Sequence, residues 1–483
     1  MSSETAEQAI AQHPSLAVSA GLRAPAPAWG GVEAALPQAS AERERAERAT
    51  ALREVWRALW VSRLLVWIGG VGAVAGFGFG PVRHALNPVG LTRGLGALGD
   101  LMAAPAARWD AAWYLTIAHD GYRPQLGAMA ASRTAFFPLY PLGSRLLSGL
   151  SLAPVVAGIL LSVVALAAGL YGLHRLTSIE VVRLDLGNHG VAGRLGGGNL
   201  GDAARLVVLL TAFAPMAVYF SAVYSESLYF ALSVGVFLCA RRGQWARAAA
   251  LAALASATRS TGIVLMIPLV LIYLYGPRAD RAPDRPDGRL KPKYRVRSDA
   301  LWIAVAPLGL CLYMAHLALA GGDALAPFHA QAVWKREFAG PYGGVWTGAK
   351  AAFEGLRQIV SLQRHHVYFP AAGGSPLIDA SHNLLLFAFL LAAIPVTVGV
   401  FRMLPVAYGA YVLAALALPL SYPVAPQPLM SLPRFLLVLF PLNMWLAVRL
   451  AQRPKALTWG LLIASAGAMM FFAGEFSTWH WVA

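Results

Sequence analysis

The 483-residue chain is dominated by apolar residues: 58% are hydrophobic, only 13% are charged, and the mean hydropathy is +0.57. A soluble domain carries roughly 25% charged residues, so this composition excludes an ordinary soluble protein and predicts a polytopic membrane protein. The length leaves room for about ten spans of about 20 residues each.

The formal net charge of +16 and the pI near 10.2 could indicate a nucleic-acid-binding protein. The basic residues, however, fall in short loops between apolar runs, which is the positive-inside pattern of membrane proteins. The two cysteines, Cys239 and Cys311, both lie inside apolar runs. We therefore expect no nucleic-acid partner, no disulfide framework and no cysteine-based metal site.

Residues 1–50 are rich in Ala, Pro, Ser and Glu and contain no apolar core, which predicts a disordered cytoplasmic tail. The first apolar run lies too far from the N-terminus to be a signal peptide. Arginines at positions 43–57 precede that run and place the N-terminus inside. Residues 51–480 then form one all-α transmembrane domain with about 10–12 membrane segments.

The first predicted span, at about 56–79, leads to a first outer loop at 81–135. Residues 139–150 follow closely spaced prolines and are predicted to form a re-entrant or juxtamembrane helix that does not cross the bilayer. A second outer loop covers 320–380. The remaining single spans are predicted at 154–174, 206–222, 228–240, 300–319, 382–401, 405–421, 434–449 and 456–474.

Residues 248–276 form one apolar run with basic loops at both ends, so both ends are expected inside. The run must then be a hairpin of two short spans with Arg259 at its outer tip. A charge inside an apolar run costs several kcal/mol and indicates a function. Arg259 could bind a lipid phosphate, snorkel to the headgroups, or pair with a carboxylate such as Glu226. For Arg434, phosphate binding and snorkelling are the alternatives.

The densest polar and aromatic cluster is Arg108–Tyr122, in the first outer loop. Read as a helix, this stretch places Asp110 on one stripe with Trp113 and Tyr114. Gly121 is suited to end that helix. The Asp110 carboxylate could accept a hydroxyl proton as a general base, or it could simply cap the helix N-terminus.

Further polar residues gather at the predicted outer face. His119 and Asp120 are neighbours, which could be a simple surface pair. The second outer loop adds His329, Trp334, Arg336, Arg364, His365, His366, Tyr368 and Asp379. His365 and His366 are more often structural than metal ligands. We predict no cofactor; Mg²⁺ or Mn²⁺ is compatible with the sequence, but nothing in it indicates a divalent cation.

No phosphate-binding loop, dinucleotide fingerprint or nucleotide-sugar domain occurs in the sequence. A glycosyl donor would therefore have to come from the membrane. A sugar on a polyprenyl phosphate needs a lipid groove, a cation for the phosphate and a base for the acceptor. One carboxylate, one arginine and an aromatic wall form a sufficient set.

These residues resemble the PIG-V-type mannosyltransferases, which include the second mannosyltransferase of glycosylphosphatidylinositol synthesis and bacterial membrane relatives. The resemblance covers roughly residues 50–475. Its blocks are Trp109–Tyr122, Ala135–Pro141, Tyr224–Leu228, Ala257–Gly262 and Ser431–Phe435. It implies a GT-C fold, an extracytoplasmic active site, a polyprenyl-phosphate-linked mannose donor and inversion at the anomeric carbon. By position, it implies that Asp110 is the catalytic base.

We therefore predict a bacterial plasma-membrane mannosyltransferase with a lipid, glycan or protein acceptor, in preference to a glycosylphosphatidylinositol. Asp110 is the predicted base, and Arg259 and Arg434 are the predicted donor-phosphate ligands. The predicted substrate-binding residues are Trp109, Trp113, Tyr114, His119, Asp120, Tyr122, Tyr140, Tyr224 and Glu226.

Two other functions fit the composition. A transporter or flippase of a lipid-linked sugar should often show inverted repeats and charges near the bilayer midplane. The sequence shows no repeat, and its charges gather at the outer mouths of the spans, which favours the enzyme. A non-catalytic subunit of a glycosyltransferase complex is the third alternative.

Overall fold

The computed structural model describes residues 32–80, 87–123, 131–187, 202–285, 291–362, 376–424 and 427–482. The chain divides into two units, Met1–Leu52 and Arg53–Ala483. Most of the predicted tail, residues 1–31, lies outside the described residues. Helix α2 (Val32–Phe77) already includes residues 32–50, which composition had placed in the tail. The rest of this description concerns the second unit.

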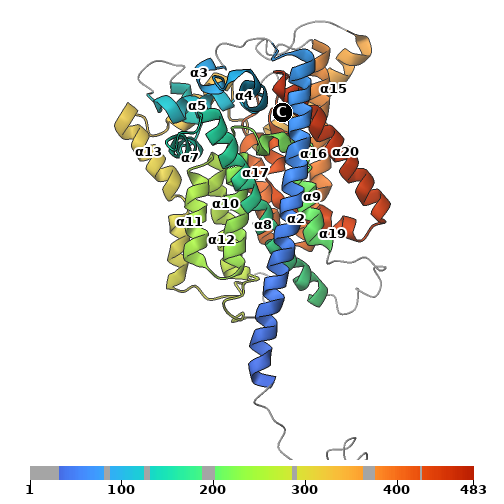
Figure 1. Ribbon diagram of the computed structural model, residues 1–483. Helices are drawn as coiled ribbons and strands as arrows, with labels where there is room; N and C mark the ends of the chain where they lie inside the picture. The colour runs from blue at the N-terminus through green and yellow to red at the C-terminus, as the bar shows by residue number, and fades with distance from the viewer. Residues whose placement is uncertain are drawn as a thin grey trace, which may run out of the picture. The chain divides into compact units, whose positions relative to one another are not determined.

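Four helical segments are each long and apolar enough to cross a membrane: Glu44–Phe77 of α2, Pro154–Leu184 of α8 (Pro154–Gly187), α16 (Pro376–Met403) and α20 (Lys455–Ser477). A fifth span results if η10 (Ser298–Val305) and α13 (Leu308–Gly321), which meet at a 43° bend, act as one. Within the described ranges, the one β-pairing is an isolated bridge between Arg336 and Val424. The protein is thus an all-α polytopic membrane protein, as predicted (Figure 1).

Two predicted spans are broken where prolines interrupt the helix. The span expected at 206–222 consists of α9 (Ala203–Ala212) and η8 (Ala217–Phe220), separated by Pro215. The span expected at 434–449 consists of α18 (Leu432–Leu437) and α19 (Phe440–Ala451), with Pro441 at the start of the second helix. Proline removes a helical N–H and clashes with the preceding turn, so neither sequence continues as one helix.

The spans expected at 228–240 and 405–421 are α10 (Glu226–Arg241) and α17 (Val406–Leu420). The hairpin expected at 248–276 is present as α11 (Trp245–Ser256), η9 (Ser260–Leu265) and α12 (Met266–Tyr275), and Arg259 lies in its turn. Helix α7 (Leu139–Ser148) has ten residues. At 1.5 Å per residue it is about 15 Å long, half the thickness of a bilayer core, so it cannot cross alone.

Short helices form the connections that the sequence placed on the outer face. The first connection contains α3 (Val89–Thr92), α4 (Gly96–Ala103), η4 (Ala104–Ala106), α5 (Ala111–Asp120) and η6 (Arg133–Ala135). The second contains α14 (Ala326–His329), η11 (Ala330–Trp334) and α15 (Pro341–Ser361).

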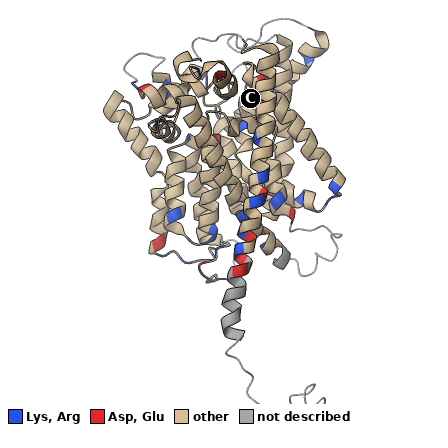
Figure 2. Cartoon of the chain, viewed as in Figure 1, with Lys and Arg blue, Asp and Glu red and all other residues tan. Residues whose placement is uncertain are grey.

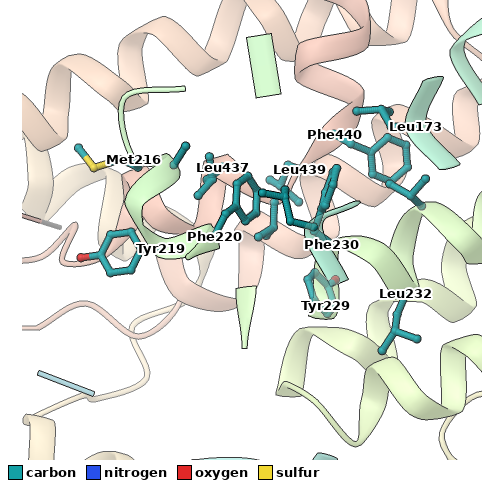
Figure 3. Packing of buried hydrophobic residues seen from close by; sticks show 14 of the residues in the cluster. Leu173, Met216, Tyr219, Phe220, Tyr229, Phe230, Leu232, Leu437, Leu439 and Phe440 are labelled. Atoms are coloured by element: carbon teal, nitrogen blue, oxygen red, sulfur yellow. The ribbon is translucent and has the colours of Figure 1, made fainter. Parts of the chain in front are cut away.

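Helix α10 lies in the middle of the apolar core. Its Phe230 packs among Phe220 of η8 and the residues Leu437, Leu439 and Phe440 at the α18–α19 break (Figure 3). Neighbouring α8 passes so close that a Cβ at Gly169 would lie 2.5 Å from the Phe230 ring. This packing holds the first part of α10 in place. Helix α2 carries a stretch of alternating charged residues, whereas charged residues are sparse along the other helices (Figure 2).

Candidate functional site

Asp110 precedes α5 and is held through the backbone. Its N–H donates to the Tyr224 hydroxyl at 3.0 Å, and that hydroxyl donates to the Arg108 carbonyl at 3.0 Å. Asp110 occupies the N-cap position, but its carboxylate makes no capping hydrogen bond. Helix α5 ends at Gly121 with φ +81°, as its sequence predicts. The carboxylate therefore points to a partner outside its own helix, and the capping alternative is wrong.

That partner is Arg434, 324 residues away in the sequence. Its Nη1 lies 2.8 Å from Oδ2 of Asp110, and its Nε lies 3.1 Å from Oε1 of Glu226. Nη1 of Arg259 donates to the same Glu226 oxygen at 2.8 Å. Asp110, Glu226, Arg259 and Arg434 thus form one ion-pair network, called here the four-residue cluster. It joins the first outer connection, α10, the α11–α12 turn and α18.

The four-residue cluster is largely shielded from solvent: the Glu226 side chain is 2% exposed, Arg434 12% and Asp110 19%. Arg259 pairs with Glu226, which was one of the alternatives for this residue, and Arg434 pairs with carboxylates as well. The Phe435 ring lies near both guanidinium groups, at 5.4 Å from Arg259 and 5.6 Å from Arg434. Two carboxylates and two arginines balance in charge, so the cluster can persist without a bound ion.

Two carboxylate oxygens in the cluster remain available. Oε2 of Glu226 is buried and has no hydrogen-bond partner among the described residues. Oδ1 of Asp110 also accepts no hydrogen bond from any residue that the structure describes, while Oδ2 is held by Arg434. A buried oxygen without a donor costs about 1–3 kcal/mol, so such atoms are expected where a ligand supplies the missing group.

Aromatic rings line the side of the cluster nearest α5. Tyr114 shares a hydrogen bond of 2.9 Å with Ser225, next to Glu226, and its ring lies 6.1 Å from Tyr224. Burial raises the pKa of the Tyr114 phenol above its usual value, so this hydroxyl stays neutral. Trp113 stacks on Phe136 at 5.6 Å. Tyr114 and Trp113 are among the predicted substrate-binding residues, whereas Phe136 is not, and these roles remain predictions.

Other predicted substrate-binding residues face elsewhere. Trp109, with φ +55°, turns its ring against Trp479 and Trp481 at 5.6 and 5.1 Å. The Tyr140 hydroxyl is fully engaged inside the protein, with the Gly158 carbonyl and the Ser162 hydroxyl, each at 2.8 Å.

The residues at the end of α5 lie apart from the cluster as well. The Tyr122 hydroxyl donates to the Phe136 carbonyl at 2.7 Å. His119 and Asp120 form a 2.7 Å pair on the surface, with exposed fractions of 64% and 37%. Among the described residues, this pair makes no hydrogen bond or ion pair with the four-residue cluster. Its geometry is that of the simple surface pair, which was the alternative interpretation.

The second outer connection contributes Trp334 and Arg336. The sequence analysis located both residues in the second outer loop but did not predict that they belong to the site. Trp334 closes edge-on over both Trp113 and Phe136, at 6.2 and 5.8 Å. Arg336, two residues on, is tied to Val424 by the β-bridge and is partly buried. Its side chain has no ion pair or hydrogen bond within the described ranges. The only sequence signal was an aromatic residue close to a basic one.

Burial and the neighbouring Arg434 lower the pKa of Arg336 to about 10, and the charge of Asp110 opposes this shift. The side chain is therefore still a cation at neutral pH. Arg336 adds a positive charge to a cluster whose other charges balance.

Metal ligands do not gather near this site. In the described part of the chain, no three His, Cys, Asp or Glu side chains are placed to hold a metal ion. His329 pairs with Asp323 at 2.8 Å on the surface. Arg364, His365, His366 and Tyr368 lie outside the described residues. The absence of a cofactor remains a prediction.

Comparison with known proteins gives one match. Residues 96–274 match the family model described as mannosyltransferase (PIG-V), a range that includes Asp110, Glu226 and Arg259. Neither a curated protein nor a solved structure matches the chain. Over residues 96–274, the chain is therefore similar to the PIG-V mannosyltransferases, and the apolar helices agree with a membrane glycosyltransferase.

Proposed function

We propose that this mannosyltransferase takes mannose from a polyprenyl-phosphate donor and transfers it on the extracytoplasmic face of a bacterial plasma membrane, within a GT-C fold. The acceptor is a lipid, glycan or protein hydroxyl. The observation that supports this most directly is the state of Asp110: Arg434 holds one carboxylate oxygen, and the other has no hydrogen-bond donor among the described residues. Asp110 also lies inside the segment that matches the family.

In the proposed reaction, the acceptor hydroxyl approaches Oδ1 of Asp110. Its oxygen attacks the anomeric carbon as its proton passes to the carboxylate. The bond between that carbon and the phosphate oxygen breaks, and its electron pair leaves with the polyprenyl phosphate. A phosphate leaving group needs no general acid, so one carboxylate is sufficient. Attack from the side opposite the phosphate inverts the anomeric configuration.

The donor phosphate needs cationic hydrogen-bond donors. Arg259 and Arg434 have this role in our prediction, but each already pairs with a carboxylate. Arg336 does not, and it is partly buried beside them. We therefore assign the main phosphate contact to Arg336 and a sharing role to the other two, since a guanidinium has five N–H donors.

The sugar would lie against the aromatic residues between α5 and the second outer connection. Trp113, Phe136 and Trp334 contact one another and present ring faces and edges. Such rings suit the apolar face of a pyranose. Oε2 of Glu226, which has no hydrogen-bond partner among the described residues, would accept a hydrogen bond from a sugar hydroxyl, because a buried carboxylate oxygen without a donor costs free energy.

The test compares membranes containing wild type, Asp110→Asn or Asp120→Asn at matched protein levels. Each receives labelled polyprenyl-phosphate mannose and a native lipid extract, and transferred mannose is counted. We expect transfer by Asp110→Asn to fall about a hundredfold or more. Asp120→Asn, on the exposed pair, should keep wild-type transfer. Equal transfer by all three proteins would remove the role of Asp110.

The same membranes separate the enzyme from the two alternatives. Movement of intact donor across the bilayer without transfer would indicate a flippase. Normal activity of a partner enzyme's complex containing Asp110→Asn would indicate a non-catalytic subunit.

A further inference from the structure

A second group of cations lies beside the C-terminal segment. Arg108 is completely buried. Its Nε donates to the Ser477 carbonyl at 2.9 Å, and its guanidinium lies 4.9 Å from the Trp479 ring and 5.6 Å from the Phe79 ring. Nη1 and Nη2 are buried and find no acceptor among the described residues. Most of the hydrogen-bonding capacity of this arginine is therefore unused.

Arg93 joins Arg108 on the same aromatic ring. Its guanidinium lies 4.5 Å from the Phe79 centroid, and its Nε is also buried without a partner in the described structure. Neither arginine has a carboxylate within ion-pair distance in the part of the chain that the structure describes. Asp100, the acidic residue nearest Arg93 in sequence, uses Oδ1 to accept from the Gly94 and Leu95 amides.

Without a bound anion, the favourable contacts of the two arginines do not compensate for the cost of burying their charges. Stacking a cation on an aromatic ring stabilises it only modestly. Burying an unpaired charge costs more than this stacking returns, and the second positive charge adds repulsion. Burial and Arg93 lower the pKa of Arg108 to about 9, which still leaves it charged at neutral pH.

Another buried arginine shows how this fold satisfies a cation that needs no ligand. Arg63 is equally buried, but its Nη1 donates to the Ala217 carbonyl at 2.7 Å and to Ser221 at 2.6 Å, and its Nη2 donates to the Ala212 carbonyl at 2.9 Å. The free donors of Arg93 and Arg108 thus differ from those of a purely structural arginine. They indicate a site that a ligand completes.

We propose that Arg93 and Arg108 bind the phosphodiester of a phospholipid headgroup, at a site separate from the four-residue cluster. Two guanidinium groups offer the paired N–H donors that phosphate oxygens accept. Phe79 lies two residues beyond the end of α2, at the end of a candidate membrane span, where headgroups are found. A bound headgroup would fasten the segment Ser477–Trp481 to the first outer connection.

The test uses the full-length protein, delipidated in an uncharged detergent. Thermal unfolding and native mass spectrometry are followed with dioleoylphosphatidylglycerol, with dioleoylglycerol, which has the same chains but no phosphate, and with inorganic phosphate. We expect phosphatidylglycerol to raise the melting temperature and dioleoylglycerol to leave it unchanged. Arg93→Gln should weaken phosphatidylglycerol binding about tenfold, the effect of losing one charge-assisted hydrogen bond. Arg145→Gln, at an exposed arginine of α7, should bind like wild type.

Further outcomes decide the ligand and the site. An equal rise with inorganic phosphate would keep the two arginines as a phosphate site but replace the lipid by the free ion. Equal binding by wild type and Arg93→Gln would overturn the site. Arg108→Met removes the buried cation and keeps an apolar stem, so without lipid it should be at least as stable as wild type. A much less stable Arg108→Met would mean that the charge is already compensated, and would also overturn the proposal.

Discussion

A buried carboxylate lies at each end of helix α10, and each carboxylate pairs with two arginines. Glu226 of α10 is the carboxylate at one end and Glu180 of α8 is the one at the other, and their surroundings differ. Glu226 begins the helix and Arg241 ends it, about 22 Å apart along the axis. At the Arg241 end, Oε1 of Glu180 accepts from Arg241 at 2.5 Å and from Tyr408 at 2.9 Å, and Oε2 accepts from Arg183 at 2.8 Å. We call this group the Glu180 cluster. Both oxygens of its carboxylate are satisfied.

At the Glu226 end, the four-residue cluster leaves Oε2 of Glu226 and Oδ1 of Asp110 without donors in the described structure. Arg336 lies beside it and has no carboxylate partner among the described residues. A complete network holds helices together, and an incomplete one costs free energy unless something else completes it. The comparison therefore separates a satisfied ion cluster from the unsatisfied one to which we assign the substrate, although their residue types are the same.

The largest effect should come from Glu180→Gln, which tests whether the Glu180 cluster only stabilises the fold. It leaves two arginines without their carboxylate, so we expect a loss of about 3–5 kcal/mol in the free energy of unfolding. Mannosyl transfer per folded molecule should stay at the wild-type level. Denaturation in detergent and transfer by the folded fraction measure the two quantities. Asp110→Asn should instead lose transfer. If Glu180→Gln loses as much transfer per folded molecule as Asp110→Asn does, the two clusters do not differ in function.

Coupling between Glu226 and Arg259 should give the next effect. Glu226→Gln and Arg259→Gln should each lower transfer at least tenfold, but the double variant should lose less than the product of the two. Each single change already removes the shared 2.8 Å ion pair, so a coupling energy of about 0.5–3 kcal/mol is expected. Glu226→Gln combined with Arg145→Gln is the control, and its losses should multiply. Multiplicative losses in the first pair would mean that the ion pair has no role in transfer.

A smaller effect is expected for Arg336→Gln. Because Arg336 makes no ion pair with any described residue, its loss should leave the melting temperature unchanged. It should raise the donor KM about tenfold, through one lost charge-assisted contact to phosphate. Arg336→Lys should recover part of the affinity, because it keeps the charge but not the planar fork. Steady-state kinetics with varied donor measure both variants. An unchanged donor KM in Arg336→Gln would indicate that Arg259 and Arg434, and not Arg336, bind the donor phosphate.

The smallest effect is expected for the exposed His119–Asp120 pair. An exposed ion pair contributes about 0–1 kcal/mol. His119→Ala should therefore change the transfer rate by less than about twofold and the free energy of unfolding by less than about 1 kcal/mol. Transfer assays and thermal unfolding check this. A large loss of transfer would indicate that the substrate reaches the end of α5 and that the site extends beyond the four-residue cluster.

The features that the sequence alone determined are those set by neighbouring residues. Hydropathy identified the all-α membrane fold, because any segment in the bilayer must satisfy its own backbone hydrogen bonds. The alternation of apolar runs and basic loops predicted the hairpin around Arg259. Gly121 predicted the end of α5, because a positive φ is accessible to glycine.

Tertiary structure decided which of these side chains meet. Arg434 reaches Asp110 across 324 positions because proline breaks the span into α18 and α19 and turns that segment toward the first outer connection. Trp109, adjacent to Asp110, instead packs against the C-terminal tryptophans because its backbone is left-handed. Periodicity and composition carry no distances between segments, so they could nominate the charged residues but could not tell a satisfied carboxylate from an open one.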